Sequence, residues 1–262
     1  MLTSGYNKRM SDQNSNHNTD NKVALITGGS RRIGAEIART LHRNGFNLAI
    51  HYRNSRSDAQ VLQNELNEIR TDSVVLIQAD LQITQGLNSL VNSTTERFGQ
   101  LDVVINNASS FYPTPIDKAS EADWDDLISS NLKAPFFLAQ AAASSLKKTQ
   151  GCIINIVDIH SERPLKEHPI YCIAKAGLAM LTKSLAKELG PEVRVNGVSP
   201  GAILWPENEM DELTQQRIIS RNFLKRQGNP GDIANTVLFL IANAPYITGQ
   251  IIAVDGGRSL NS

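Results

Sequence analysis

The sequence predicts one α/β domain built around a doubly wound sheet of seven parallel strands, with helices on both faces. The chain has 262 residues, of which 40% are apolar, and this is enough for one continuous core. From Lys22 onward, short apolar runs alternate with longer amphipathic runs, and no Pro/Gly/Ser-rich linker or repeat divides them. Nearly continuous Val/Ile/Leu strands separated by helices are typical of a parallel sheet covered on both sides.

Each strand is predicted from a short apolar run, and each helix from apolar residues at helical spacing. The strands are expected at residues 23–26, 47–50, 74–77, 103–105, 152–157, 194–198 and 251–254. The helices are expected near residues 33–44, 57–70, 84–98, 121–149, 168–189 and 231–243. Such sheets bind ligands outside the carboxyl ends of their strands, so the segments after Ile26, Ile105, Val157 and Val198 should meet at one cleft.

The sequence divides into a polar N-terminal segment and one domain, and one stretch of the domain interrupts the alternation of strands and helices. Residues 1–21 are polar and rich in Asn, with no apolar stretch typical of a signal peptide, so we expect a disordered leader on a cytoplasmic protein. Residues 22–262 are expected to form the domain. Within it, residues 201–231 break the alternation and are expected to act as a substrate lid. Trp205 either closes over substrate or only anchors a surface loop.

The composition argues against several classes of protein. Lys plus Arg equals Asp plus Glu, at 26 each, so no electrostatic case exists for binding nucleic acid or an anionic membrane surface. No apolar run is long enough to span a bilayer. Cys152 and Cys172 lack partners at metal-ligand spacing, and the histidines form no His-Glu-x-x-His pattern, so we expect no metal site.

Tyr171 and Lys175 stand four residues apart on a predicted helix and therefore share one face. A phenol with a pKa of about 10 is a poor acid or base at neutral pH, and an adjacent cation lowers that pKa toward the working range. The pair is thus predicted to be an acid/base unit. Asp158 ends a predicted strand upstream, where a carboxylate would repel the oxyanion of a ketone under reduction. The alternative is that Asp158 only caps the next turn.

A glycine-rich turn, residues 27–34, follows the first predicted strand and opens a helix. Free N–H groups and the positive end of the helix dipole at such a turn can hold a pyrophosphate, although similar turns also occur without a ligand. Arg32 replaces the central glycine and follows Arg31. Two guanidinium groups at the mouth of the cleft can pair with phosphate or with a polar substrate.

The second predicted strand continues as His51-Tyr52-Arg53, with no Asp or Glu before Asp58. A carboxylate at this point would bind the ribose 2′-hydroxyl of NAD and repel a 2′-phosphate, whereas Arg53 and Ser55 can bind one. NADPH is therefore the predicted cofactor. The alternative is that the arginines of this loop are only solvated charges.

Two further loops carry candidate ligand contacts. After the third predicted strand, Asp80 precedes Leu81 and is placed either to accept a hydrogen bond from adenine or to cap the next helix. In the loop 109–115, Phe111 is expected to stack on a flat heterocycle, with a gain of roughly 0.5–1.5 kcal/mol beyond area burial. The alternative is that Phe111 and Tyr112 cap the core beneath a loop.

With five motifs in order, the chain resembles the short-chain dehydrogenase/reductase family, whose members have a Rossmann fold, over about residues 22–262. The motifs are residues 27–34, Asn106-Asn107-Ala108, Asn131, Tyr171 with Lys175, and Pro200-Gly201. The chain is most similar to the pteridine reductase branch, because of Arg31-Arg32, His51-Tyr52-Arg53, the run 107–113 and Asp158 in place of the usual serine.

The resemblance implies a role for each matching position. Lys175 would bind the nicotinamide ribose, Asp158 would deliver a proton together with Tyr171, and Asn131 would hold a water in a relay to Lys175. Phe111 would sandwich the substrate ring against nicotinamide. The implied cofactor-binding residues are Gly28, Arg31, Arg32, Ile33, Gly34, His51, Tyr52, Arg53, Ser55, Asp80, Leu81, Asn107, Ala108, Ser109, Tyr171, Lys175, Pro200 and Gly201. The implied substrate-binding residues are Arg32, Ser109, Phe111, Asp158, Tyr171 and Trp205.

The implied activity is NADPH-dependent reduction of dihydrobiopterin, dihydromonapterin or dihydrofolate. Two alternatives remain: reduction of a 3-oxoacyl thioester, which the same Tyr171–Lys175 unit would serve, and a non-catalytic NADP(H)-sensing regulator, which would usually lack one of that pair. The resemblance also implies a homotetramer that packs through helices 121–149 and 168–189 and the C-terminal strands. The apolar stripe of Leu178, Leu181 and Leu185 faces either a second copy or the chain's own sheet.

Overall fold

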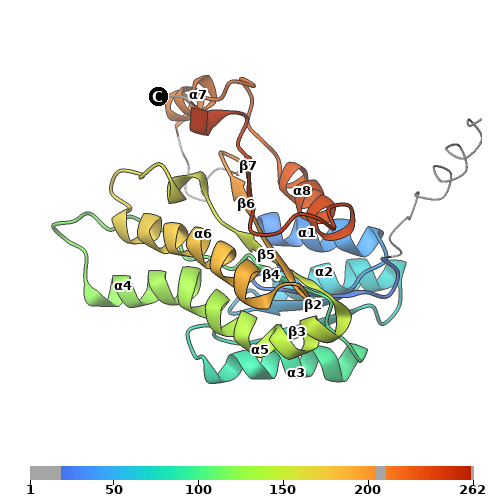
Figure 1. Cartoon of the computed structure of the whole chain (residues 1–262). Coiled ribbons are helices and arrows are strands. Elements are labelled where there is room, and N and C mark those ends of the chain that lie inside the picture. The colour runs from blue at the N-terminus through green and yellow to red at the C-terminus, as the bar shows by residue number, and fades with distance from the viewer. Residues whose placement is uncertain (1–18, 205–210, 261–262) are drawn as a thin grey trace, which may run out of the picture.

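The computed structural model describes residues 19–204 and 211–260 and has the predicted doubly wound fold (Figure 1). Within these residues, all neighbouring strands pair in parallel and form one seven-stranded sheet in the order β3-β2-β1-β4-β5-β6-β7. The order reverses between β1 and β4, and this is where such sheets bind ligands. The strands are β1 (Val23–Ile26), β2 (Asn47–Tyr52), β3 (Val74–Gln78), β4 (Val103–Asn106), β5 (Cys152–Ile156), β6 (Arg194–Pro200) and β7 (Ile251–Val254).

Helices cover both faces of the sheet, as predicted. One apolar core contains residues of α1 (Arg32–Arg43), α2 (Arg56–Ile69) and α8 (Pro230–Ala242), and the other contains residues of α3 (Gln85–Phe98), α5 (Ala134–Thr149) and α6 (Pro169–Leu189). Successive strand residues point to opposite faces: Ala24 and Ile26 lie in the first core and Leu25 in the second. Two shorter helices are α4 (Glu121–Ile128) and α7 (Glu212–Ser220).

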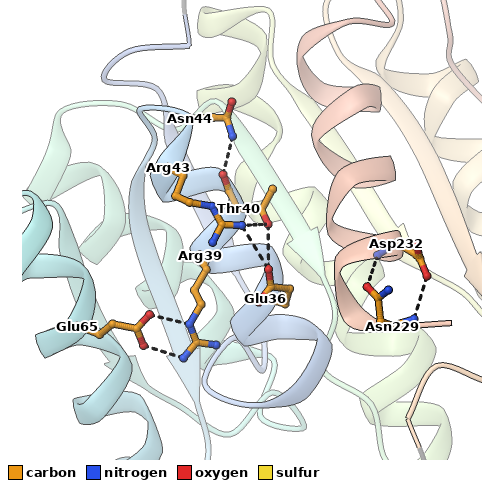
Figure 2. A network of polar contacts seen from close by, with 8 residues as sticks. All are labelled: Glu36, Arg39, Thr40, Arg43, Asn44, Glu65, Asn229 and Asp232. Atoms are coloured by element: carbon orange, nitrogen blue, oxygen red, sulfur yellow. Dashed lines mark hydrogen bonds and ion pairs between the residues drawn. The ribbon is translucent and has the colours of Figure 1, made fainter.

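A bidentate ion pair fixes α1 to α2 (Figure 2). The Nε and Nη2 atoms of Arg39 donate to the two carboxylate oxygens of Glu65, each at 2.7 Å. The pair lies at the surface, so its contribution to stability is at most about 1 kcal/mol. Its geometric effect is more specific, because it holds α1, which opens directly after the glycine-rich turn, in a fixed position against α2. Figure 2 also shows the capping box of Asn229 and Asp232 at the start of α8.

The segment predicted as one helix at residues 121–149 is divided by a π-helical turn at Ser129–Lys133. This widened turn separates α4 from α5 and contains the buried Asn131. The Asn131 Nδ2 atom donates to the carbonyl of Leu127, one turn earlier, and to that of Ser110 in another loop, each at 3.0 Å. A single wide turn inside a helix often marks a functional site.

The structure differs from the sequence-based boundary at the N-terminal end of the domain. Residues 19–21, assigned to a disordered leader, form a turn in which the Thr19 hydroxyl donates to the carbonyl of Asn44 and the Asn21 N–H to that of Gly45. The interruption at residues 201–231 contains α7, and its Trp205 lies outside the described residues. No helix among the described residues is long and apolar enough to cross a membrane.

Candidate active site

A cleft of about 490 Å³ opens at the carboxyl ends of the strands, where the sequence placed it. Asn131 lies outside its lining, and Trp205 is outside the described residues. The remaining predicted site residues line the cleft together: Gly28, Arg31, Arg32, Ile33, Gly34, His51, Tyr52, Arg53, Ser55, Asp80, Leu81, Asn107, Ala108, Ser109, Phe111, Asp158, Tyr171, Lys175, Pro200 and Gly201.

Asp158 contacts both the phenol and the turn that follows β5. The Tyr171 hydroxyl donates to Oδ2 of Asp158 at 2.8 Å, while Oδ1 accepts the backbone N–H of His160, also at 2.8 Å. The two interpretations of Asp158, proton relay and turn cap, are therefore compatible, because each uses a different oxygen. Tyr171 is buried, so its hydrogen bond to the carboxylate lies in a poorly hydrated setting.

The electrostatics of Tyr171 differ from the sequence-based expectation. Burial raises its pKa well above the ordinary value, and the charge of Asp158 and the hydrogen bond to it act in the same direction, while the Ser109 hydroxyl opposes them. Lys175 does not reverse this, because its Nζ lies 5.7 Å from the centre of the Tyr171 ring and donates to the carbonyl of Ile156 at 3.0 Å. The proton thus stays on the Tyr171 oxygen and is shared with Asp158.

Lys175 is almost fully buried at the base of the cleft. Burial lowers its pKa to about 8, and the negative charge of Asp158 opposes that change. A buried ammonium of this kind is held in place by its hydrogen bond and by the nearby carboxylate. Its predicted contact with a nicotinamide ribose stays a prediction.

Asn131 contacts the loop after β4 through Ser109. The Ser109 hydroxyl donates to Oδ1 of Asn131 at 2.6 Å, and Ser109 also acts to lower the pKa of Tyr171. The π-helical turn therefore positions a side chain that lies close to the phenol. The water relay to Lys175 that the resemblance implies stays a prediction.

The loop after β4 places Phe111 in the cleft and fixes it by its neighbours. The Tyr112 hydroxyl donates to Asp126 at 3.0 Å, and burial together with that carboxylate raises the pKa of Tyr112 to about 12. Tyr112 thus anchors the loop to α4, and neither Phe111 nor Tyr112 is among the buried residues of the core. Phe111, in contrast, is half exposed and lines the cleft. Its ring packs on His168, a contact that sequence reasoning missed.

Gly28 and Arg32 both have left-handed backbone in the glycine-rich turn. Gly28 has φ 58°, and a Cβ there would come within 2.9 Å of the Ala108 Cα. The side chain of Asn107 donates to the carbonyls of Thr27 and Gly28 at 3.0 and 2.9 Å and fixes the turn to β4. Arg32 has φ 53°, a conformation that favours glycine. The predicted contact of Arg32 with phosphate or substrate stays a prediction.

The first turn of α1 suits an anion. Its N-cap, Arg31, makes no side-chain capping bond, and no acidic residue lies in that turn. His51 supports the loop from beneath: its Nδ1 accepts the N–H of Gly28 at 3.1 Å, and its Nε2 donates to the carbonyl of Ala79 at 3.0 Å. This pattern requires a neutral ring, and burial lowers the pKa of His51 accordingly.

A group of hydroxyl and guanidinium side chains lies where the 2′-phosphate was predicted. The Ser30 and Ser55 hydroxyls are 2.7 Å apart, and Arg53 lines the same cleft. The Arg31 Nε atom lies 3.8 Å from Oδ2 of Asp58. The first carboxylate that follows β2 in the sequence is therefore paired with a cation. Ser30 was not predicted, although its place within the glycine-rich turn is a signal that could have found it.

Asp80 does not cap α3, whose N-cap is Thr84. Its Oδ1 accepts the N–H of Gln82 at 3.0 Å and so caps the preceding turn, and its predicted contact with adenine stays a prediction. The other lining residues that sequence reasoning missed share no motif and follow from the fold: Asn54, Gln82, Ser110, Ser130, Ile156, Val157, Ile203 and Leu204.

The fold and the site define an oxidoreductase that uses a nicotinamide cofactor. The model of a protein family described as enoyl-(acyl carrier protein) reductase matches residues 28–259. Pteridine reductase 1 of Leishmania tarentolae is 35% identical, over 91% of this chain and 96% of that protein. The 3-oxoacyl-[acyl-carrier-protein] reductase FabG of Staphylococcus aureus (strain Mu50 / ATCC 700699) is 37% identical, over 90% of this chain and 97% of that protein. The chain belongs to the short-chain dehydrogenase/reductase family.

A third relative is named as a dehydrogenase. The BbsD subunit of (2S)-[(R)-hydroxy(phenyl)methyl]succinyl-CoA dehydrogenase of Thauera aromatica is 36% identical, over 92% of this chain and 97% of that protein. These relatives are all named as oxidoreductases, and the chain is accordingly an enzyme of that class that acts on a small molecule.

Proposed function

We propose that the protein reduces a dihydropterin, namely dihydrobiopterin, dihydromonapterin or dihydrofolate, to the tetrahydropterin with NADPH. The observation that carries this proposal is the 2.8 Å hydrogen bond between Tyr171 and Asp158 in the cleft. NADPH supplies a hydride when it is bound. A pterin accepts that hydride at a ring carbon and needs a proton at a ring nitrogen.

The chain's own residues serve the proton side of this reaction. Tyr171 keeps its proton because burial and Asp158 raise its pKa, and this makes it a weaker acid than a free phenol. Hydride addition to the ring carbon leaves the electron pair on the ring nitrogen, which becomes strongly basic and takes the proton. Lys175 contributes a positive charge beneath both groups, which offsets the negative charge left when a proton departs. A ketone would instead develop an oxyanion beside the Asp158 carboxylate, and the two negative charges would repel each other.

The wall of the cleft supports a flat substrate. Phe111 offers a half-exposed ring on the same side of the cleft as Tyr171, and the edge-to-face contact of the two rings fixes their spacing at 4.8 Å between centres. Arg32 at the mouth adds a cation that can bind a polar heterocycle or a phosphate. Pteridine reductase 1 of Leishmania tarentolae supports the same substrate class by name.

The preference for NADPH over NADH rests on the end of β2. Ser30, Arg53 and Ser55 offer hydroxyl and guanidinium donors there, and Asp58 pairs with Arg31. A 2′-phosphate accepts such donors, whereas a free 2′-hydroxyl is usually bound by a carboxylate. We propose Ser30 as an addition to the predicted set.

The second candidate function is reduction of a 3-oxoacyl thioester. The staphylococcal FabG relatives favour it, because they match over a similar share of the chain at 37% identity. Tyr171 and Lys175 would serve that reaction equally well. Asp158 is the residue that argues for the pterin.

The deciding experiment is a spectrophotometric panel with purified protein. Dihydrobiopterin, dihydromonapterin, dihydrofolate and acetoacetyl-CoA are each offered with NADPH and with NADH, and loss of the reduced nicotinamide absorbance is followed. We expect turnover with at least one dihydropterin and a lower KM for NADPH than for NADH. No oxidation of NADPH with any dihydropterin, together with good turnover of acetoacetyl-CoA, would reject the proposal in favour of the second candidate.

We also propose a homotetramer, as the family resemblance implies. An apolar groove lies between the π-helical turn, α5 and α6, lined mainly by Leu132, Phe136, Phe137 and Met180, and Phe136 and Met180 are exposed. Leu178 does not contribute, because it is buried in a cluster with Val157. Sedimentation velocity of the purified protein tests the tetramer.

A further inference from the structure

The ring of Phe111 lies between two side chains from the first turn of α6. It stacks on His168, with 4.7 Å between ring centres and 13° between planes. It also meets Tyr171 edge to face, at 4.8 Å and 77°. His168 is the N-cap of α6 and Tyr171 lies three residues later, so both rings come from one face of the same turn. The aromatic wall and the proton donor are therefore mounted on a single rigid element.

The histidine itself is held in a fixed orientation. Its Nδ1 donates to the carbonyl of Lys166 at 2.8 Å, and its backbone N–H donates to the carbonyl of Leu165 at 3.2 Å. The Leu165 N–H in turn donates to the Cys172 sulfur on α6, at 3.2 Å. The imidazole plane is thus set by the backbone before it meets Phe111.

A backbone hydrogen bond joins the two loops next to the stacked rings. The Thr114 N–H, three residues after Phe111, donates to the carbonyl of Glu167 at 2.6 Å. Glu167 has φ 65°, a conformation that residues other than glycine seldom adopt, and it directly precedes His168. On the other side of Phe111, the carbonyl of Ser110 accepts from Asn131. The loop is therefore anchored before and after Phe111, and His168 covers one face of its ring.

Phe111 is nevertheless 50% exposed, and it lines the cleft. His168 stacks on the ring and Tyr171 meets it edge to face, so the half of Phe111 that stays exposed contributes to the lining of the cleft. A phenylalanine on a loop has two side-chain torsions to immobilise, and a ligand that must order it binds more weakly by that cost. The stack removes this cost in advance.

We propose that His168 is a positioning residue, which holds Phe111 as a preformed wall and so favours flat heteroaromatic substrates over flexible ones. The proposal rests on the proposed pterin reduction for its effect on catalysis, but the contact between the two rings can be tested without it. Aromatic pairs contribute about 0.5–1.5 kcal/mol, which corresponds to about 2- to 12-fold in an equilibrium constant.

The catalytic test compares His168→Ala, His168→Phe and the control Glu162→Ala, an exposed residue of the same segment. In His168→Ala we expect KM for the preferred dihydropterin to rise by about 2- to 12-fold, with kcat and KM for NADPH nearly unchanged. His168→Phe keeps a ring and should restore KM, and Glu162→Ala should match the wild type. A purely structural role would lower kcat and raise both KM values together, and this result would overturn the proposal. So would equal losses in the Ala and Phe variants.

A second measurement keeps the two proposals separate. The free energies of unfolding of His168→Ala, Phe111→Ala and the double variant form a cycle that needs no substrate. Non-additive values support the positioning contact, even if the wild-type protein turns over no dihydropterin and the proposed function fails. Additive values overturn it, even if dihydropterin turnover is found.

Discussion

The Tyr171 hydroxyl donates to the carboxylate of Asp158 at 2.8 Å, across a distance of thirteen residues in the chain. The contact joins the end of β5 to the first turn of α6, and it places a carboxylate where it keeps the phenol protonated. An acid held in this way can act at a ring nitrogen, which needs a proton, but opposes charge on a carbonyl oxygen. The choice between the two candidate substrates therefore depends on this pair.

Asp158→Asn should separate shape from proton transfer. The amide oxygen can still accept the His160 N–H, but the side chain cannot pass on a proton. We expect kcat for dihydropterin to fall by about 10²- to 10⁴-fold, the usual contribution of a positioned acid or base. Steady-state kinetics with a matched thermal unfolding curve provides the measurement. A variant that keeps wild-type turnover would show that Asp158 serves only as a turn cap.

Lys175→Met should change how stability depends on pH. The pKa of Lys175 falls from 10.5 in the unfolded chain to about 8 in the folded protein, so the unfolded state binds more protons between those values. Below about pH 8, the buried charge of Lys175 therefore lowers the free energy of unfolding by its full amount. This penalty decreases as the pH rises toward 10.5. The difference in free energy of unfolding between wild type and variant, measured by urea titration at pH 7 and pH 10, should shift in favour of the wild type at the higher pH. A constant difference would contradict a buried, partly discharged lysine.

Arg32→Gly should stabilise the fold and weaken ligand binding. Glycine adopts φ 53° without the cost of about 1–2 kcal/mol that other residues bear in the left-handed region. Arg32→Ala loses the same guanidinium and keeps the backbone cost, so it serves as the matched control. We expect both variants to raise KM for NADPH or dihydropterin about tenfold or more. Only the glycine variant should have a higher Tm than the wild type.

Arg53→Ala should lower the selectivity for NADPH. The expected loss is about tenfold or more in kcat/KM with NADPH, with little change for NADH, because only the former has a 2′-phosphate. Arg56→Ala is the control, since Arg56 begins α2 and does not line the cleft. If Arg53→Ala lowered kcat/KM equally with NADPH and NADH, Arg53 would be only a solvated charge. The same conclusion would follow if Arg53→Ala and Arg56→Ala had equal effects.

Cofactor binding should weaken in acid through His51. Its folded pKa is lowered below 6.5, so protons favour the unfolded state, and stability falls as the pH drops through 6.5 toward the folded value. Protonation also removes the acceptor for the Gly28 N–H. We expect the Kd for NADPH to rise as the pH falls below 6.5, where the folded ring begins to bind a proton, and His51→Gln to flatten that rise. His42→Gln is the control, because burial lowers the pKa of that histidine too, but it bonds to Ser73 away from the cleft.

Strands and helices could be predicted because their signals are local. A run such as residues 23–26 has no charges and must be buried, and the helices begin and end within a residue or two of the predicted limits. The π-helical turn at Ser129–Lys133 could not be predicted, since it is fixed by the bonds of Asn131 to a loop twenty-one residues away. The turn at residues 19–21 depends likewise on contacts with Asn44 and Gly45.

Motifs predicted most residues that line the cleft, but not their electrostatics. Spacing placed Lys175 beside Tyr171, yet the direction of the pKa change depends on burial and on which oxygen the Lys175 Nζ reaches. His168 escaped prediction for a related reason. A single histidine before a helix has no distinctive pattern, and its contact with Phe111 exists only once two loops are brought together.

The capping bond from the His160 N–H to Asp158 has an evolutionary consequence. A serine hydroxyl can accept the same N–H, so this turn tolerates either residue without rebuilding. Exchange of these two residues during evolution therefore changes the charge beside the Tyr171 hydroxyl and leaves the fold of the turn intact.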